Sequence, residues 1–238
     1  MNKQNKFIFD VDGTLTPSRC QIDMDFAVYF TDFCTDNHVY LVTGSDREKT
    51  LEQVGEEIYS LAKRVYNCSG SDVWEGEKNV YTSDWKLPEQ AREWLTKELK
   101  SSSFPLRTGI HIEDRPGMVN FSIVGRNATM GERKLYVRYD TANEERVKIA
   151  KEFKKRFPDI EAVVGGETGI DIFPVGKDKA QIVEDFDKKD KLYFFGDRMD
   201  KDGNDYSLSK KVHYARSVTG WQQTKETLCY LQEAGIAA

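Results

Sequence analysis

Residues 8–17 read Ile-Phe-Asp-Val-Asp-Gly-Thr-Leu-Thr-Pro, and this stretch constrains the fold more than any other part of the chain. The apolar segment from Lys6 to Phe9 predicts a buried strand that ends at Asp10. Asp12 follows two residues later, so on extended backbone the two carboxylates point the same way. At the carboxyl end of a strand they predict an anionic site for Mg²⁺ and a phosphate group. Asp10 could attack phosphorus as a nucleophile, and Asp12 could transfer a proton.

Extended and helical patterns alternate at both ends of the chain. The predicted strands span residues 5–10, 38–42, 64–68, 192–195 and 212–215, and the predicted helices span 22–36, 46–55, 177–187 and 221–232. This alternation predicts a doubly wound parallel sheet of the α/β class, similar to a Rossmann fold. Ligands of such sheets bind at the carboxyl ends of the strands, where Asp10 and Thr43 fall.

The middle of the chain has a different pattern. After about residue 82, helices are predicted over 88–100 and 142–156, and strands over 106–113, 117–124, 159–164 and 168–173. This order favours a compact α+β unit with an antiparallel sheet. We therefore expect a discontinuous core, residues 1–81 and 177–238, with an inserted domain over residues 82–176.

Further polar residues are predicted at the same edge of the core sheet. The Thr43 hydroxyl follows the second strand and could hold a transferring phosphoryl group together with nearby backbone N–H groups. The run Tyr-Phe-Phe-Gly at residues 193–196 delivers Asp197 there, and Asp205 follows in Gly-Asn-Asp. Lys177 and Lys179 both lie where the core resumes, and an ammonium group there would neutralise the nucleophile.

Composition and charge exclude several functional classes. The formal net charge of −5 disfavours a nonspecific nucleic-acid binder, and we expect no nucleic-acid partner. No apolar run approaches the roughly 18 residues of a membrane span, and the N-terminal residues lack the core of a signal peptide. Four widely separated cysteines disfavour a disulfide framework or a zinc site. A cytoplasmic protein is the expectation.

Two sets of motifs resemble known families. The Asp-x-Asp-Gly-Thr-Leu pattern resembles the first motif of the haloacid dehalogenase superfamily of phosphotransferases. Residues 114–126 read Asp-Arg-Pro-Gly-Met-Val-Asn-Phe-Ser-Ile-Val-Gly-Arg, followed by Glu132 and Arg133, and residues 165–174 read Gly-Gly-Glu-Thr-Gly-Ile-Asp-Ile-Phe-Pro. With Gly-Asp at 196–197 and Gly-Asn-Asp at 203–205, these strings resemble eukaryotic-type phosphomannomutases, from Asp10 to about Thr224.

The resemblance implies a function and a set of site residues. It implies a Mg²⁺-dependent interconversion of mannose 6-phosphate and mannose 1-phosphate, or of the glucose pair, activated by a hexose 1,6-bisphosphate. It selects Lys179 over Lys177 as the catalytic lysine. It places Mg²⁺ on Asp10, the Asp12 carbonyl, Asp197 and Asp205. It assigns sugar-phosphate binding to Arg19, Arg115, Asn120, Arg126, Arg133, Gly169 and Asp171. It also makes the insert a cap, through which a homodimer could form.

Three departures from the family pattern leave alternatives open. Gly169 stands where the family has serine, so only its backbone N–H can contact the ligand. Thr43-Gly44 replaces Gly-Gly, a form that also occurs in sugar phosphatases of the superfamily. Ser209, Lys210 and Lys211 occupy a segment where the family holds an additional cation. A sugar-phosphate phosphatase is therefore the alternative enzyme, and a phosphosugar-binding module without turnover is the alternative outside enzymes.

Overall fold

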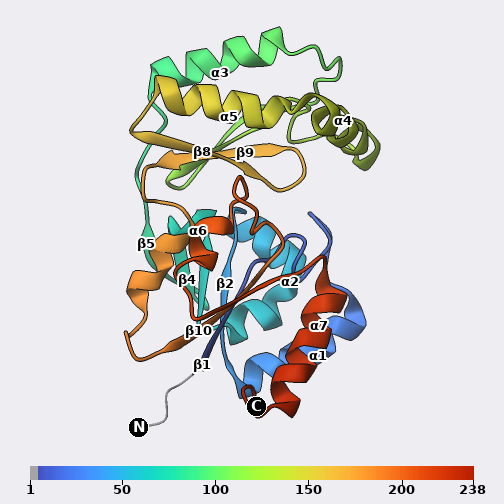
Figure 1. Ribbon diagram of the computed structural model, residues 1–238, viewed down its shortest axis with the longest axis vertical. Helices are drawn as coiled ribbons and strands as arrows, with labels where there is room; N and C mark the ends of the chain where they lie inside the picture. Colours follow the sequence, from blue (N-terminus) through green and yellow to red (C-terminus); the bar gives the residue numbers. More distant parts are fainter. Residues whose placement is uncertain (1–4) are drawn as a thin grey trace.

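The computed structural model describes residues 5–238, so residues 1–4 of the expected core lie outside the described part. Within the described chain there is a seven-stranded sheet in the order β11-β10-β1-β2-β3-β4-β5 (Figure 1). Its first five strands are parallel, which confirms the predicted α/β class. These strands are β1 (Asn5–Phe9), β2 (His38–Val42), β3 (Arg64–Asn67), β10 (Lys191–Gly196) and β11 (Tyr214–Ser217).

The central strands are apolar on both faces because helices cover both sides of the sheet. Phe9 on β1 pairs in register with Phe195 on β10, and their rings stack with centroids 4.8 Å apart. One face is covered by α1 (Met24–Asp36), α2 (Arg47–Leu61) and α7 (Trp221–Glu233), and the other by the 3₁₀ segment η2 (Lys179–Asp185) and α6 (Tyr206–Ser209). Burial on both faces fixes where β1 and β10 end, and therefore where Asp10 and Asp197 project.

An antiparallel hairpin extends this sheet beyond β3. It consists of β4 (Asp72–Glu75) and β5 (Lys78–Thr82), and the short 3₁₀ turn η1 (Cys68–Gly70) leads into it. Every residue of β5 is exposed. The sequence did not predict this hairpin, because an exposed edge strand leaves no alternating apolar pattern.

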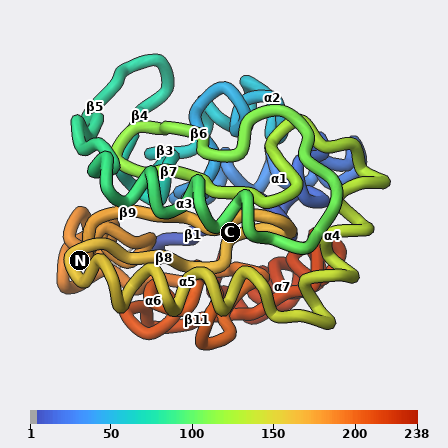
Figure 2. Tube along the Cα trace, turned by 90° about the horizontal axis from the view of Figure 1, so that it is seen from above, coloured from blue at the N-terminus to red at the C-terminus, as the bar shows by residue number. Residues whose placement is uncertain are grey.

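The second sheet has four antiparallel strands in the order β6-β7-β9-β8. The strands are β6 (Ile112–Arg115), β7 (Met118–Phe121), β8 (Ile160–Gly165) and β9 (Gly169–Pro174). Helices α3 (Glu89–Ser101) and α5 (Glu145–Arg156) lie side by side on its outer face, and α4 (Met130–Asn143) lies at one end (Figures 1 and 2). The opposite face looks toward the larger sheet. The predicted antiparallel α+β unit is therefore present.

Several predicted elements differ from the structure, most clearly the following. Residues 106–111 precede the strand instead of belonging to it, and β6 begins at Ile112. Helix α4 was not predicted, and α5 begins at Glu145 instead of 142. The predicted helix over 177–187 is a 3₁₀ segment. Helix α2 continues to Leu61 through a kink at Gly55, where the backbone φ is 81°.

No helix within residues 5–238 is both long enough and apolar enough to span a bilayer.

Candidate active site

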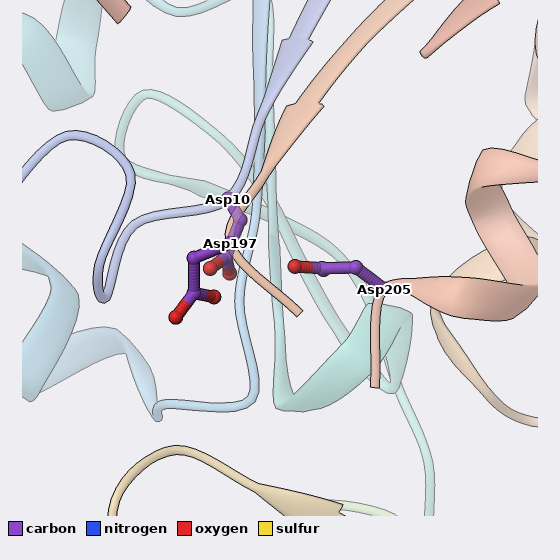
Figure 3. Close-up of side chains that lie close together, drawn as sticks. All are labelled: Asp10, Asp197 and Asp205. Atoms are coloured by element: carbon purple, nitrogen blue, oxygen red, sulfur yellow. The ribbon is translucent and has the colours of Figure 1, made fainter. Parts of the chain in front are cut away.

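Three carboxylates converge at the carboxyl edge of the larger sheet. Asp10 follows β1, Asp197 follows β10, and Asp205 directly precedes α6 (Figure 3). One carboxylate oxygen of each lies within 4.8 Å of the others. The backbone N–H of Asp10 donates to the Phe195 carbonyl at 2.9 Å, which joins the two strand ends. Parallel pairing of β1 with β10 is thus what brings Asp10 and Asp197 together.

Gly13 allows the first loop to approach Asp197 closely. Its φ is +75°, and a Cβ atom there would lie 2.7 Å from the Asp197 carboxylate carbon. Any other residue would be strained in its backbone and would also push Asp197 away. The Asp-Gly step of the first motif is therefore required by the packing of the site as well as by the turn.

Lys179 is fully buried between two of these carboxylates. Its ammonium group donates to Asp10 Oδ1 at 2.5 Å and to Asp205 Oδ1 at 2.7 Å. Burial lowers the pKa of Lys179, but Asp10 and Asp205 outweigh this effect and raise it above its ordinary value. Lys179 is therefore a fixed positive charge beside the candidate nucleophile. This is the position expected of the catalytic lysine that was selected over Lys177.

The carboxylate site has an excess of negative charge that a divalent cation would balance. Burial raises the pKa of Asp10 well above its ordinary value, and Asp205 and Asp197 raise it further against the opposing effect of Lys179. Burial, with Asp205 next, raises the pKa of Asp197 to about 7. Oxygen donors at this spacing fit Mg²⁺, which prefers a few carboxylates.

Asp205 contributes less directly than Asp10 and Asp197. Its Oδ1 accepts from Lys179, and its Oδ2 accepts from the backbone N–H of Arg198 at 3.1 Å. Asp205 has no exposed surface, whereas Asp10 and Asp197 both line a pocket. These contacts leave Asp205 better placed to hold Lys179 than to face a ligand.

Asp12 is held by three donors in a polar network. The backbone N–H of Arg19 donates to Asp12 Oδ1 at 2.6 Å, and Gln53 Nε2 donates to the same atom at 3.0 Å. The Ser45 hydroxyl donates to Oδ2 at 3.4 Å. Arg19 makes its contact from a left-handed backbone conformation with φ of 60°. Sequence reasoning did not identify Gln53, which lies on the buried face of α2 without any motif.

Thr43 lies beside the carboxylates with its backbone fixed on both sides. Its N–H donates to the Tyr66 carbonyl at 2.9 Å, and its carbonyl accepts from the Ser69 N–H at 2.8 Å. Its hydroxyl oxygen accepts from the Ser45 N–H at 3.0 Å. The Ser45 N–H is thus already bonded to Thr43. The hydroxyl proton of Thr43 can still be donated to a ligand.

A pocket lies between the two sheets and collects the predicted residues. Asp10, Asp12, Thr43 and Asp197 line one end, and residues of the smaller sheet and its loops line the other. Apart from Lys179 and Asp205, which lie behind the carboxylates, every candidate site residue lines this pocket; the ones beyond the four above are Arg19, Arg115, Asn120, Arg126, Arg133, Gly169 and Asp171.

The far end of the pocket is rich in guanidinium groups. Burial first, and then the neighbouring Arg126 and Arg133, lower the pKa of Arg19 to about 10. Burial likewise lowers the pKa of Arg126, with Arg115 next. Mutual repulsion of this kind is relieved by an anion bound among the guanidinium groups. The pocket therefore has a carboxylate end and an arginine end.

Glu113 holds two of these arginines. Its Oε2 accepts from both Nε and Nη2 of Arg115, and its Oε1 lies 2.9 Å from Arg126 Nε. Arg115 also donates from Nη1 at 2.6 Å to the carbonyl of Gly44, in the loop that follows β2. All these Arg115 contacts are to protein atoms, so in this arrangement Arg115 braces the pocket wall more than it faces a ligand.

Asn120 and Asp171 form the wall that faces the carboxylates. Residues alternate between the two faces of a strand, so Val119 and Phe121 pack under the helices while Asn120 points away from them. Asn120 Nδ2 donates to Asp171 Oδ1 at 2.8 Å. A Cβ atom at Gly169 would lie 2.6 Å from Asn120 Nδ2. Glycine at 169 therefore gives Asn120 the space to reach Asp171.

The family model for eukaryotic phosphomannomutase matches residues 29–233. The phosphomannomutase of Saccharomyces cerevisiae is 31% identical over 211 residues, which cover 84% of this chain and 83% of that protein. The phosphomannomutase of Galdieria sulphuraria is 30% identical over 228 residues, which cover 91% of this chain and 90% of that protein.

Solved structures share the fold at low sequence identity. IMP-bound IMP-nucleotidase of Plasmodium falciparum superposes with a TM-score of 0.65 at 17% identity, covering 97% of this chain and 68% of that one. The C-terminal domain of trehalose-6-phosphate phosphatase of C. albicans gives 0.63 at 15% identity, covering 97% and 92%. The chain therefore belongs to the eukaryotic phosphomannomutase family.

Proposed function

We propose that this protein is a Mg²⁺-dependent phosphohexomutase that interconverts mannose 6-phosphate and mannose 1-phosphate. The observation that carries the proposal is the lining of a single pocket, in which Asp10 and Asp12 are joined by the guanidinium groups of Arg19, Arg126 and Arg133. A hexose bisphosphate has the same pattern, since one phosphate reacts while the other lies across the sugar ring. Glucose phosphates have the same charges and are the second substrate pair to assay.

Asp10 is the proposed nucleophile. A carboxylate oxygen of Asp10 bonds to one phosphorus of a hexose 1,6-bisphosphate, and the bond from that phosphorus to the sugar oxygen breaks. Asp12 gives its proton to the departing sugar oxygen. The hexose monophosphate leaves and mannose 1-phosphate binds. Its 6-hydroxyl attacks the phosphorus on Asp10, the bond from that phosphorus to Asp10 breaks, and Asp12 takes the hydroxyl proton. The mannose 1,6-bisphosphate so formed reorients, its 1-phosphoryl group passes to Asp10 as Asp12 returns the proton to the sugar oxygen, and mannose 6-phosphate is released.

Three fixed groups support this transfer. Asp10 and Asp197, with the Asp12 backbone carbonyl, are the proposed Mg²⁺ ligands, and the bound cation would offset charge on the phosphoryl oxygens. Lys179 supplies a second positive charge, held in place by Asp205. Gln53 and the Arg19 N–H hold Asp12 in position.

We propose that residues 82–176 act as a cap over a core formed by residues 1–81 and 177–238. Contacts between the two sheets support this division at the pocket itself. Arg115 donates to the Gly44 carbonyl, and Arg19 Nη1 donates to the Arg126 carbonyl at 3.0 Å. Each bond joins an arginine that lines the pocket to a loop of the other part of the molecule, as expected of a cap that closes on its ligand.

A sugar-phosphate phosphatase on the same scaffold is the second candidate. It is favoured by the carboxylates among the arginines, because Glu113 pairs with Arg115 and Arg126 and Glu167 pairs with Arg133. These pairs reduce the net positive charge that a second phosphate would meet. In that case water, and not a sugar hydroxyl, would accept the phosphoryl group from Asp10.

Substitution of the arginines separates the two functions. Arg126→Ala and Arg133→Ala should each cost roughly 2–4 kcal/mol of transition-state binding, the range for removing one partner of a buried charge pair. This corresponds to a loss on the order of 30- to 1,000-fold in kcat/KM for hexose-phosphate isomerisation. Hydrolysis of acetyl phosphate should change little, since that substrate has no distal phosphate. Both reactions are to be measured on both variants.

Arg138→Ala is the matched control, because Arg138 lies on the same helix as Arg133 but is exposed and away from the pocket. It should leave both reactions unchanged. A parallel fall of isomerisation and acetyl phosphate hydrolysis in the pocket variants would contradict a role in holding the distal phosphate.

A further inference from the structure

Arg133 is a guanidinium with unused hydrogen-bonding capacity. It is buried, with 5% of its surface exposed, and it lines the pocket. Its Nη2 lies 3.2 Å from Glu167 Oε2. Its Nε is buried and has no hydrogen-bond partner among the described residues. A buried N–H without an acceptor is costly, so this position favours a ligand that offers several acceptor oxygens.

The two glutamates at the arginine end are held very differently. Glu113 makes three contacts to two arginines, and its side chain is 20% exposed. Glu167 makes one ion pair, to Arg133, and its side chain is 40% exposed. It lies in the tight turn between β8 and β9, next to Gly166, whose φ is 51°. Glu113 is thus a fixed part of the wall, whereas Glu167 can turn toward solvent.

We infer that Glu167 is a displaceable internal anion that competes with the distal phosphate for Arg133. The inference deepens the proposed function and rests on it for the identity of the ligand. A phosphate group carries more negative charge than a carboxylate and offers three acceptor oxygens, so it can engage both Nη2 and the unpartnered Nε. Glu167 must leave for this to happen, since two anions would otherwise repel each other beside Arg133.

A competitor of this kind makes Glu167 a specificity-determining residue. Ligands whose distal group is a carboxylate or a hydroxyl gain too little at Arg133 to displace it, whereas a phosphate gains enough. The competition also weakens binding of the proper ligand, because part of the binding free energy is spent in separating Glu167 from Arg133. Removing the charge of Glu167 should therefore tighten phosphate binding and reduce discrimination.

The test is a calorimetric titration of mannose 1-phosphate into the wild type, Glu167→Gln and Glu167→Ala in Mg²⁺-free buffer. Without a cation the carboxylate end repels the phosphate, so the titration reports on the arginine end. Both variants should bind roughly two- to fivefold more tightly than the wild type, the range for a partly exposed ion pair. Glu161→Gln, which removes a charge from β8 at an ion pair with Lys154, should leave Kd unchanged.

Unchanged or weaker binding in both Glu167 variants would overturn the inference. Equal tightening in Glu161→Gln would also overturn it, because the effect would then be one of net charge. The outcome is separable from that of the proposed function. A wild type that isomerises while Glu167→Gln binds no more tightly keeps the function and removes the competitor. If the wild type only hydrolyses hexose phosphates, but Glu167→Gln binds mannose 1-phosphate more tightly, the competitor is kept and the mutase function is removed.

Discussion

The charges of the carboxylate site balance only in part, because Asp10, Asp197 and Asp205 lie close together while Lys179 brings one positive charge to them. Lys179 neutralises one of the carboxylates that surround it, and its position between Asp10 and Asp205 keeps it from reaching into the pocket. Burial, and after it the negative charge of the neighbouring carboxylates, raises the pKa values of Asp10 and Asp197 above their ordinary values. A bound divalent cation would offset this negative charge. We therefore expect the three carboxylates to favour the metal-bound protein strongly over the metal-free protein.

Asp197→Ala tests this balance at the residue scale. The substitution leaves only Asp10 and the Asp12 carbonyl as direct ligands, so Mg²⁺ should bind at least about 100-fold more weakly. Activity should fall with it. The measurement is a Mg²⁺ titration of activity for the wild type and the variant. Asp202→Ala is the control, since Asp202 is exposed on the same loop. An unchanged Mg²⁺ requirement in Asp197→Ala would remove Asp197 from the metal site.

Site residues that follow a recognisable pattern in the sequence could be predicted, and site residues without such a pattern could not. Asp10, Asp12 and Asp197 follow apolar strands, so strand ends alone place them at one edge. The cap arginines were found only through resemblance, because isolated arginines usually lie at the surface. Gln53, Glu113 and Glu167 were missed. Each supports a predicted residue through a contact between segments distant in sequence, which no local pattern reveals.

At the scale of elements, the strongest failure of prediction is helix α4. Its buried residues are Arg133, Tyr136 and Asp140, so two of the three positions facing inward are charged. A helix whose buried face carries charged side chains has no apolar stripe for periodicity to detect. The hydrophobic strands of the core posed no such difficulty, because burial on both faces gives continuous apolar runs. Sequence patterning therefore missed the helix that carries Arg133.

The N-terminus of α4 depends on a capping box. The Thr129 hydroxyl accepts from the Glu132 N–H at 3.3 Å, and Glu132 Oε2 accepts from the Thr129 N–H at 2.7 Å. Thr129→Ala should therefore lower the free energy of unfolding by about 1 kcal/mol. It should also weaken sugar-phosphate binding, since Arg133 lies one turn into this helix.

Chemical denaturation and a ligand titration of the same variant check both effects. Thr141→Ala is the control, because Thr141 is exposed near the other end of α4 and its hydroxyl donates only to the Val137 carbonyl. If the two threonine variants are equally stable and bind equally well, the capping box does not support the site.

At the scale of the whole molecule, the two sheets meet at the pocket through polar contacts and a small apolar cluster. Val164 of β8 forms an isolated bridge with Gly203, in the loop between Asp197 and Asp205. Met118 and Phe173 of the smaller sheet pack against Cys68, in the turn η1 that follows β3. The two-layer architecture was predictable from the order of patterns, but these contacts were not, because they depend on how the sheets face each other.

The central claim is that the phosphoryl group passes to a sugar hydroxyl and not to water. Phosphorus NMR of mannose 1-phosphate with the protein, Mg²⁺ and a trace of glucose 1,6-bisphosphate follows both reactions in one tube. Asp10→Asn is the negative control, since an amide is a far poorer nucleophile and should produce neither change. The account predicts that the mannose 1-phosphate signal declines as that of mannose 6-phosphate grows, with little inorganic phosphate. Growth of inorganic phosphate without mannose 6-phosphate would contradict it.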